Sequence, residues 1–86
     1  MDFGDALRAL RTGYRLARAG WNGKGMFIYL VPPGKYPPST AVAKKYFKGK
    51  LVPYQAYIAM KTVDNTVVPW LASQTDLLAE DWMVLE

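Results

Sequence analysis

The sequence predicts an α+β fold: a small antiparallel β-sheet with an N-terminal helix and short connecting helices, in a chain that forms homo-oligomers. Four apolar residues near the start recur at the spacing of a helix with one apolar face: Phe3, Ala6, Leu7 and Leu10. Further along, short apolar runs alternate with glycine, proline and asparagine, the pattern of strands joined by turns. At 86 residues, the chain is expected to be a single domain over residues 1–86.

The first part of the chain predicts one helix and two strands. Asp2 can cap the helix, and Gly13 can end it in a left-handed turn. Residues 14–18 follow as a short strand. Residues 26–31 are a continuous apolar run, which is typical of a central strand covered on both faces, or of one that a neighbouring subunit covers.

The middle of the chain, residues 32–53, is less regular. It begins with four prolines that exclude regular structure there, so we expect a loop. Ser39 or Thr40 can then cap a short helix over residues 41–47.

The last third predicts a hairpin, a short helix and a closing strand. The expected segments are a strand over residues 54–62, a turn over 63–66, a strand over 66–70, a helix over 76–79 and a strand over 82–85. Pro69 stops the returning strand or places it at an edge of the sheet. Ser73 lies where it can cap the helix.

Composition restricts the chemistry available to the chain. It has no cysteine and no histidine, which excludes disulfides and thiolate metal sites and removes the commonest general base and metal ligand. We therefore expect no cofactor, no metal and no catalytic residue. The net charge of +4 favours anionic ligands. Aromatic residues make up 14% of a small chain, so some of them are expected to face a ligand or a second copy.

The N-terminus lacks the basic and then apolar order of a signal peptide. No stretch of the sequence is long and apolar enough for a membrane span. We therefore expect a soluble protein of the cytoplasm without a membrane partner.

Residues 18–27, the glycine loop, combine three glycines with an arginine, a lysine and a tryptophan. Glycines let the backbone turn sharply and expose its amides, and Arg18 and Lys24 favour anions there. Trp21 offers a flat face on which a base can stack. The pattern fits a nucleotide-type site, but it also fits a plain turn between strands with Trp21 folded onto the core.

A second polar segment, residues 68–82, has similar character. Ser73, Thr75 and Asp76 gather at an expected helix N-terminus, a place that attracts phosphate or hydroxyl groups. Plain capping is the alternative. Trp70 beside them can stack on a ligand or fill the core, whereas Trp82 is expected in the core.

Two charged segments are interpreted as surface. The basic and aromatic cluster over residues 44–50 could touch nucleic acid, but a solvated helix with Tyr46 or Phe47 turned inward is preferred. Glu80 and Asp81 are neighbours in sequence that do not face one another on a helix, so we treat them as surface charges.

Together these motifs resemble the Thoeris anti-defence family 2 proteins, which are small phage and prophage proteins. The resemblance rests on Arg-x-Gly-Trp-Asn-Gly-Lys-Gly-Met-Phe at residues 18–27 and Trp-Leu-Ala-Ser-Gln-Thr-Asp-x-Leu-Ala-x-Asp-Trp at residues 70–82. It covers residues 2–31 and 54–86 and leaves residues 32–53 unmatched.

The resemblance implies a sponge, a protein that binds the nucleotide messenger of a bacterial immune system and keeps it from its effector. The implied ligand is a cyclic ADP-ribose-type nucleotide, and some members also hold cyclic dinucleotides at a separate pocket. A homotetramer is also implied, with the cyclic ADP-ribose sites between protomers. The implied place of action is the cytoplasm of the host bacterium. No catalysis is implied.

Eleven residues receive ligand-binding roles from the resemblance: Arg18, Trp21, Asn22, Gly23, Lys24, Gly25, Phe27, Trp70, Ser73, Thr75 and Asp76. The two tryptophans would contact the adenine, and the cations and loop amides would meet the pyrophosphate. The other polar side chains would bind ribose hydroxyls and base edges. Phe27 would pack behind the loop or against the base.

Two further functions stay open from the sequence. One is an enzyme that hydrolyses a cyclic nucleotide, which the lack of histidine and cysteine disfavours. The other is a nucleic-acid or protein interaction module that uses residues 44–50.

Overall fold

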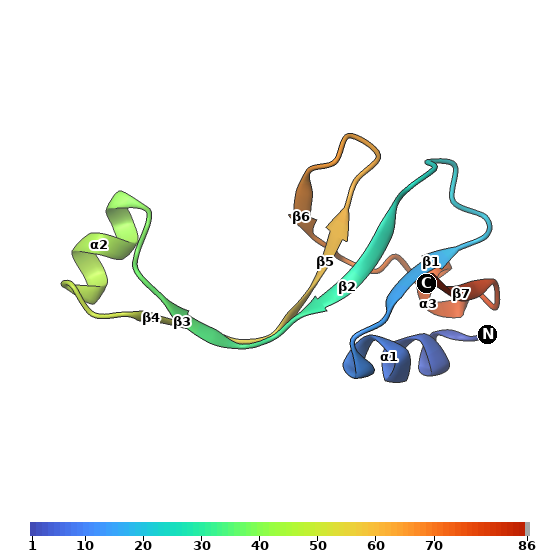
Figure 1. The fold of residues 1–86 in the computed structure, drawn as a ribbon, viewed down its shortest axis with the longest axis horizontal. Helices are drawn as coiled ribbons and strands as arrows, with labels where there is room; N and C mark the ends of the chain where they lie inside the picture. Colours follow the sequence, from blue (N-terminus) through green and yellow to red (C-terminus); the bar gives the residue numbers. More distant parts are fainter. Residues whose placement is uncertain (86) are drawn as a thin grey trace.

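Residues 1–85, the part of the chain that this computed structural model describes, form three helices and seven strands (Figure 1). The helices are α1 (Phe3–Thr12), α2 (Ala41–Phe47) and α3 (Gln74–Leu78). The strands are β1 (Arg15–Arg18), β2 (Phe27–Val31), β3 (Gly34–Tyr36), β4 (Val52–Tyr54), β5 (Tyr57–Lys61), β6 (Val67–Pro69) and β7 (Trp82–Leu85). The predicted α+β class with an antiparallel sheet is confirmed.

Capping and apolar spacing produce α1 as predicted. The Asp2 carboxylate accepts a hydrogen bond from the Asp5 amide at 2.9 Å. Gly13 ends the helix in the left-handed conformation with a φ of 101°. Ala6 and Leu10 on the apolar face are completely buried, so α1 is fixed to the sheet by its hydrophobic side.

Five strands form one antiparallel sheet in the order β6-β5-β2-β1-β7. β2 lies at its centre, as the continuous apolar run predicted. The turn between β5 and β6 places Asn65 at a φ of 62°, and Pro69 lies in the edge strand β6. The predicted hairpin is therefore confirmed.

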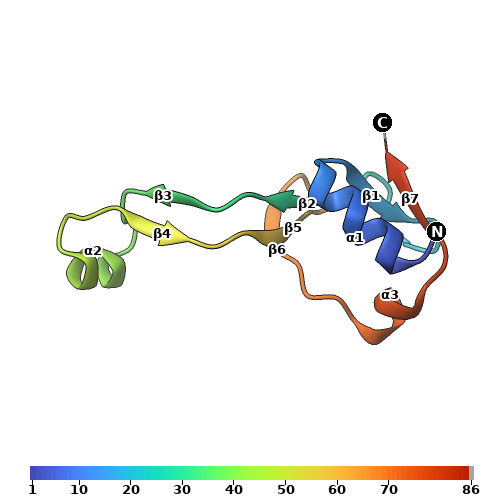
Figure 2. The ribbon, with the colours of Figure 1, turned by 90° about the horizontal axis from the view of Figure 1, so that it is seen from below.

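The two faces of this sheet differ in what covers them. Leu16 and Ile28 pair in register and pack with α1 and Trp82 in the core. In Figure 2, α1 and α3 are seen on the same side of the strands. The opposite face, here called the open face, carries no helix of residues 1–85. Two small residues on this face, Ala17 and Ala59, are buried. Its larger apolar side chains include seven that are exposed or half-buried: Phe27, Tyr29, Val31, Tyr57, Val67, Met83 and Leu85.

Residues 32–56 form an arm instead of the predicted loop (Figures 1 and 2). β3 and β4 pair with each other as a two-stranded ribbon that continues from β2 and β5, and α2 lies at its tip. The expectation of an irregular segment was wrong for β3 and β4, and the strand expected over residues 54–62 is broken between β4 and β5. Proline is tolerated in this ribbon because each strand has one free edge, where no N–H donor is needed. Pro53 in β4, which pairs with Lys35, is an example. The helix prediction is confirmed, with Thr40 as its cap.

The arm determines the overall shape of the molecule. The principal axes measure 45, 26 and 25 Å. α2 lies at one end of the long axis, while the N-terminus, α3 and β7 lie at the other (Figures 1 and 2). Within residues 1–85, none of the helices has the length and apolar character needed to cross a membrane.

Candidate functional site

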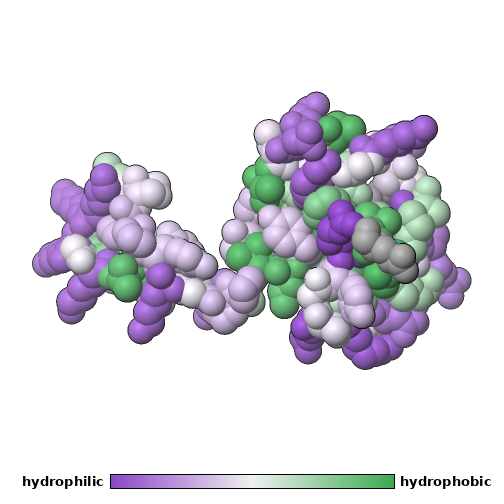
Figure 3. Space-filling model, viewed as in Figure 1, coloured by the Kyte–Doolittle hydropathy of each residue, from purple (hydrophilic) through white to green (hydrophobic). Residues whose placement is uncertain are grey.

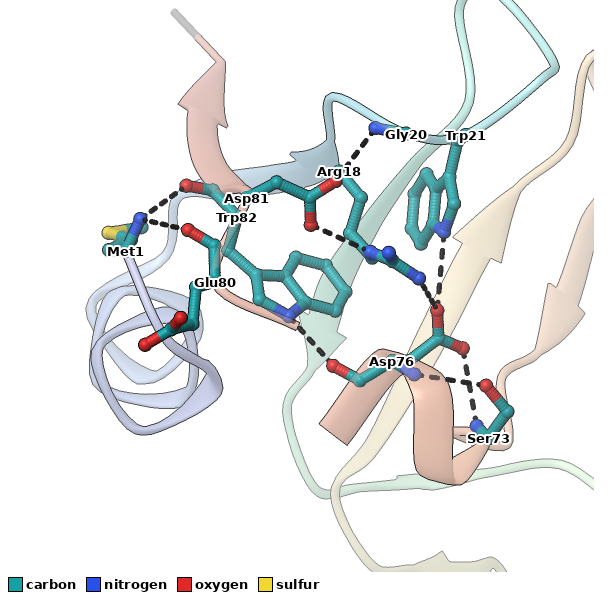
Figure 4. A network of polar contacts seen from close by, with 9 residues as sticks. All are labelled: Met1, Arg18, Gly20, Trp21, Ser73, Asp76, Glu80, Asp81 and Trp82. Atoms are coloured by element: carbon teal, nitrogen blue, oxygen red, sulfur yellow. Dashed lines mark hydrogen bonds and ion pairs between the residues drawn. The ribbon is translucent and has the colours of Figure 1, made fainter. Parts of the chain in front are cut away.

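A network of ion pairs and hydrogen bonds lies where β1 ends and the glycine loop begins (Figure 4). Arg18 Nε donates to Asp81 Oδ1 at 2.8 Å, and Arg18 Nη1 donates to Asp76 Oδ1 at 2.9 Å. The Gly20 amide donates to the second Asp81 oxygen, also at 2.8 Å. The side chains of Arg18 and Asp76 are only 16% and 14% exposed. The network thus joins the glycine loop to α3 and to the segment before β7.

Asp76 connects α3 to this network because the start of the helix fixes its carboxylate. The Ser73 hydroxyl accepts from the Asp76 amide at 3.1 Å, and Asp76 Oδ2 accepts from the Ser73 amide at 3.2 Å. This reciprocal pair is a capping box, which confirms the predicted cap. The other carboxylate oxygen accepts from Arg18 and from Trp21 Nε1, the latter at 3.3 Å.

Arg18 stabilises the ionised forms of both carboxylates in the network. Burial raises the pKa of Asp76, but hydrogen bonds from Arg18, Ser73 and Trp21 outweigh burial and hold that pKa below its ordinary value. The Arg18 guanidinium likewise lowers the pKa of Asp81. Hydrogen bonds to Asp81 and Asp76 raise the pKa of Arg18 in turn. Both carboxylates are therefore ionised at neutral pH, and together they exceed the charge of Arg18.

Three tryptophans pack beside the network. Trp82 is 2% exposed, which confirms its predicted place in the core, and its Nε1 donates to the main-chain oxygen of Asp76 at 2.9 Å. Trp21 and Trp70 each meet the Trp82 ring edge-on, with ring centroids 5.4 and 6.0 Å apart. Both are half-buried, so each packs against the core and keeps part of its ring accessible.

A cleft of about 430 Å³ opens beside the glycine loop. Its lining comes from β1, the loop and β7: Ala17, Arg18, Ala19, Trp21, Gly23, Lys24, Gly25, Met26, Met83 and Leu85. Gly25 has a φ of 78°, a conformation that other residues rarely adopt. Its carbonyl oxygen accepts from Lys61 Nζ at 2.8 Å, which ties the loop to β5.

The structure brings part of the predicted site together. Four predicted residues share the network: Arg18, Trp21, Ser73 and Asp76. Gly23, Lys24 and Gly25 line the cleft with Arg18 and Trp21, and Trp70 lies across the Trp82 ring. Asn22 and Thr75 are exposed and belong to neither group.

Phe27 is separated from the network by the pleat of the sheet. β1 pairs with β2 through Leu16 and Ile28, so Phe27 lies on the open face. Its ring centroid is 5.0 Å from the Arg15 guanidinium and 5.7 Å from Lys61 Nζ. Phe27 therefore packs with cations on the face opposite the core.

Asp81 is the network residue that the sequence prediction missed. Its interpretation as a surface charge was wrong, because its carboxylate binds both Arg18 and the Gly20 amide. The partners are far apart in sequence, so spacing gives no sign of the pairing. The only local signal is that Asp81 precedes the closing strand, whose Trp82 pairs with Arg18 in register.

Comparison with known proteins gives matches that extend over nearly the whole chain. The Thoeris anti-defense 2-like domain family matches residues 1–85. A protein of Bacillus phage SP01 named Thoeris anti-defense 2 is 39% identical over 88 residues, covering 99% of this chain and 94% of the phage protein. The chain belongs to the Thoeris anti-defense 2-like family. The resemblance predicted from the two motifs is confirmed, and the family match also runs through the arm, which those motifs left unmatched.

Membership of the Thoeris anti-defense 2-like family implies a role in phage anti-defence. The cleft of this Thoeris anti-defense 2-like domain offers an aromatic ring, a glycine-rich backbone and the Lys24 ammonium group. These groups bind ligands by stacking, hydrogen bonding and charge. Arg18 differs from Lys24 because carboxylates of its own chain already hold it.

Proposed function

We propose that this domain sequesters a cyclic ADP-ribose-type immune messenger and holds it without degrading it. The observation that carries the proposal is that Trp21 and Lys24 line one cleft in a chain of an anti-defence family. Anti-defence by sequestration requires tight binding in the cytoplasm of the infected bacterium and no chemical step.

The cleft and its surroundings match the parts of such a ligand. Trp21, and Trp70 across the Trp82 ring, offer surface for an adenine, at about 1–3 kcal/mol for each stacked base. Lys24 and the amides of residues 22–25 meet the pyrophosphate. Asn22 and the polar side chains in the first turn of α3 bind the ribose hydroxyls.

Charge balance favours a site shared between copies of the chain. Arg18 is already paired with two carboxylates, so it adds little net attraction for a pyrophosphate. Further cations must come from outside this network. The open face supports self-association, because it presents apolar side chains that no helix within residues 1–85 covers. We therefore include a homotetramer with sites between protomers in the proposal.

Sequestration fits the side chains better than hydrolysis does. A general acid must hold a proton near the working pH, whereas Asp76 and Asp81 both have lowered pKa values beside Arg18. The sequence also has no histidine or cysteine to serve as a base or nucleophile. A bound nucleotide is therefore expected to leave unchanged.

Recovery of the ligand tests this proposal. The protein is incubated with a cyclic ADP-ribose, separated from free nucleotide, denatured by heat, and the released material is analysed by mass spectrometry. We expect the intact cyclic nucleotide. Opened or hydrolysed product would establish an enzyme instead, and absence of retained nucleotide would overturn the proposal. A parallel sample with a cyclic dinucleotide tests for a second ligand class.

Two variants of equal charge change locate the binding site. Lys24→Ala removes a cation that lines the cleft and is expected to weaken binding about tenfold. Arg11→Ala removes an exposed cation of α1 outside the cleft and is expected to bind like the wild type. Equal losses in both variants, measured by calorimetric titration, would contradict the placement of the ligand in this cleft.

A further inference from the structure

The ammonium group of Lys61 lies against the glycine loop. Lys61 is the last residue of β5, and its Nζ donates to the Gly25 carbonyl oxygen at 2.8 Å. Gly25 lines the cleft, and a Cβ built on Gly25 would lie 3.5 Å from Lys61 Nζ. A strand from outside the cleft lining thus brings a cation to the border of the cleft.

The pairing of the strands places Lys61 on the same face of the sheet as the floor of the cleft. Lys61 pairs with Phe27, and the register of β1 with β2 places Ala17 on the other side of Phe27. Ala17 pairs in turn with Met83. Directly paired residues share a face, so Lys61 lies on the open face in one row with two residues that line the cleft, Ala17 and Met83.

The Phe27 ring helps to hold the Lys61 side chain in this position. Nζ lies over the ring, 5.7 Å from its centroid, which is within the range of cation–π attraction. An aromatic ring attracts a cation but carries no net charge. The contact therefore orients the ammonium group without neutralising it.

No carboxylate within residues 1–85 lies at ion-pair distance from Lys61. An ammonium group has three N–H donors, and the Gly25 oxygen accepts from one of them. Arg18 differs, because two carboxylates of its own chain hold it. Lys61 can thus offer an anion both net charge and hydrogen bonds.

We propose that Lys61 binds the pyrophosphate of the sequestered nucleotide, together with Lys24 and the loop amides. The inference rests on the proposed function, because the nucleotide supplies the pyrophosphate. Gly25 joins the two cations, since it follows Lys24 in the chain and its carbonyl group holds Lys61. The contact with Gly25 orders the ammonium group before the ligand arrives, which reduces the entropy lost on binding.

A neutral and a charged replacement of Lys61 test the role of its charge. Lys61→Met keeps an unbranched side chain beside Phe27 but removes the ammonium group. It is expected to weaken the binding of a cyclic ADP-ribose about tenfold at low ionic strength, as measured by calorimetric titration. Lys61→Arg keeps the charge and is expected to bind within about threefold of the wild type.

Ionic strength separates a contact with the ligand from an effect on the loop. Salt screens the attraction between an ammonium group and a phosphate, so the difference between wild type and Lys61→Met is expected to shrink as salt is added. A loss caused only by a displaced loop would be the same at every salt concentration.

Lys35→Met is the matched control, because it makes the same substitution in β3 of the arm. Figure 3 shows that the arm stands clear of the rest of the molecule. The Lys35→Met variant is expected to bind like the wild type at every salt concentration. A loss equal to that of Lys61→Met would overturn the proposal.

Inorganic pyrophosphate tests the site without any nucleotide. In NMR spectra of the wild-type protein with labelled lysines, the Lys61 side-chain signals are assigned by their loss in Lys61→Met. They are expected to shift with saturation as pyrophosphate is added, whereas the Lys35 signals stay in place. This titration decides the role of Lys61 even where the protein retains no cyclic ADP-ribose.

Three further outcomes would overturn the proposal. The first is a Lys61 signal that pyrophosphate shifts no more than that of Lys35, which would indicate an adventitious ion only. The second is wild-type nucleotide affinity in Lys61→Met. The third is a loss of affinity that Lys61→Arg shares or that salt does not reduce. Retained nucleotide in any of these cases would leave sequestration standing, whereas a saturable pyrophosphate shift without nucleotide retention would support the Lys61 site and overturn sequestration.

Discussion

At the residue scale, Arg18 shows how the fold changes what a side chain can offer a ligand. In sequence it is one cation in a glycine loop, and its role at a pyrophosphate stays a prediction. In the folded chain it lies between Asp76 and Asp81 and orders the loop against α3. Lys24, the other cation of the loop, also lines the cleft but takes no part in this pairing. Lys24 is therefore the sharper probe of anion binding.

The network makes stability depend on pH in a defined direction. The pKa values of Asp76 and Asp81 are lowered from an ordinary 3.8 in the folded chain, so the unfolded chain binds more protons as the solution becomes acidic. The stabilisation is complete above the ordinary value and is lost as pH falls through the lowered values. We expect the stability difference between wild type and Asp81→Asn to shrink below about pH 4 in urea titrations. A difference that stays constant from pH 7 to pH 3 would show that the ion pair contributes nothing.

At the scale of elements, local sequence signals predicted the helices and the central sheet, and they failed where neighbours decide the structure. The Asp2 cap, the Gly13 terminus and the Ser73 cap all act within one turn, so spacing reveals them. The β3–β4 ribbon depends on cross-strand pairing, as Lys35 with Pro53 shows, and its prolines indicated a loop. The pairing of Arg18 with Asp81 likewise follows from the contact of β1 with β7.

The start of α3 is an element whose loss can be measured directly. Ser73→Ala removes the cap and is expected to lower the free energy of unfolding by about 1 kcal/mol. Because Asp76 shares the capping box, the change also loosens its contact with Arg18. Thr75→Ala in the same helix is the control, since Thr75 is exposed and does not cap. Urea unfolding followed by tryptophan fluorescence should separate the two, and equal midpoints would contradict the role given to the cap.

At the scale of the whole molecule, the sequence could indicate an oligomer but not its surfaces. Small size and many aromatic residues favour association, whereas the open face appears only when alternate residues of five strands lie on one side. The tip of the arm and α3 come to lie at opposite ends of the long axis only in the folded chain.

Native mass spectrometry of the wild-type protein with a cyclic ADP-ribose tests the central claim most directly. It reports the number of chains and the mass of the retained ligand in one spectrum. The account predicts four chains that carry nucleotide of unchanged mass. Chains that retain no nucleotide, or nucleotide heavier by one water molecule, would contradict it.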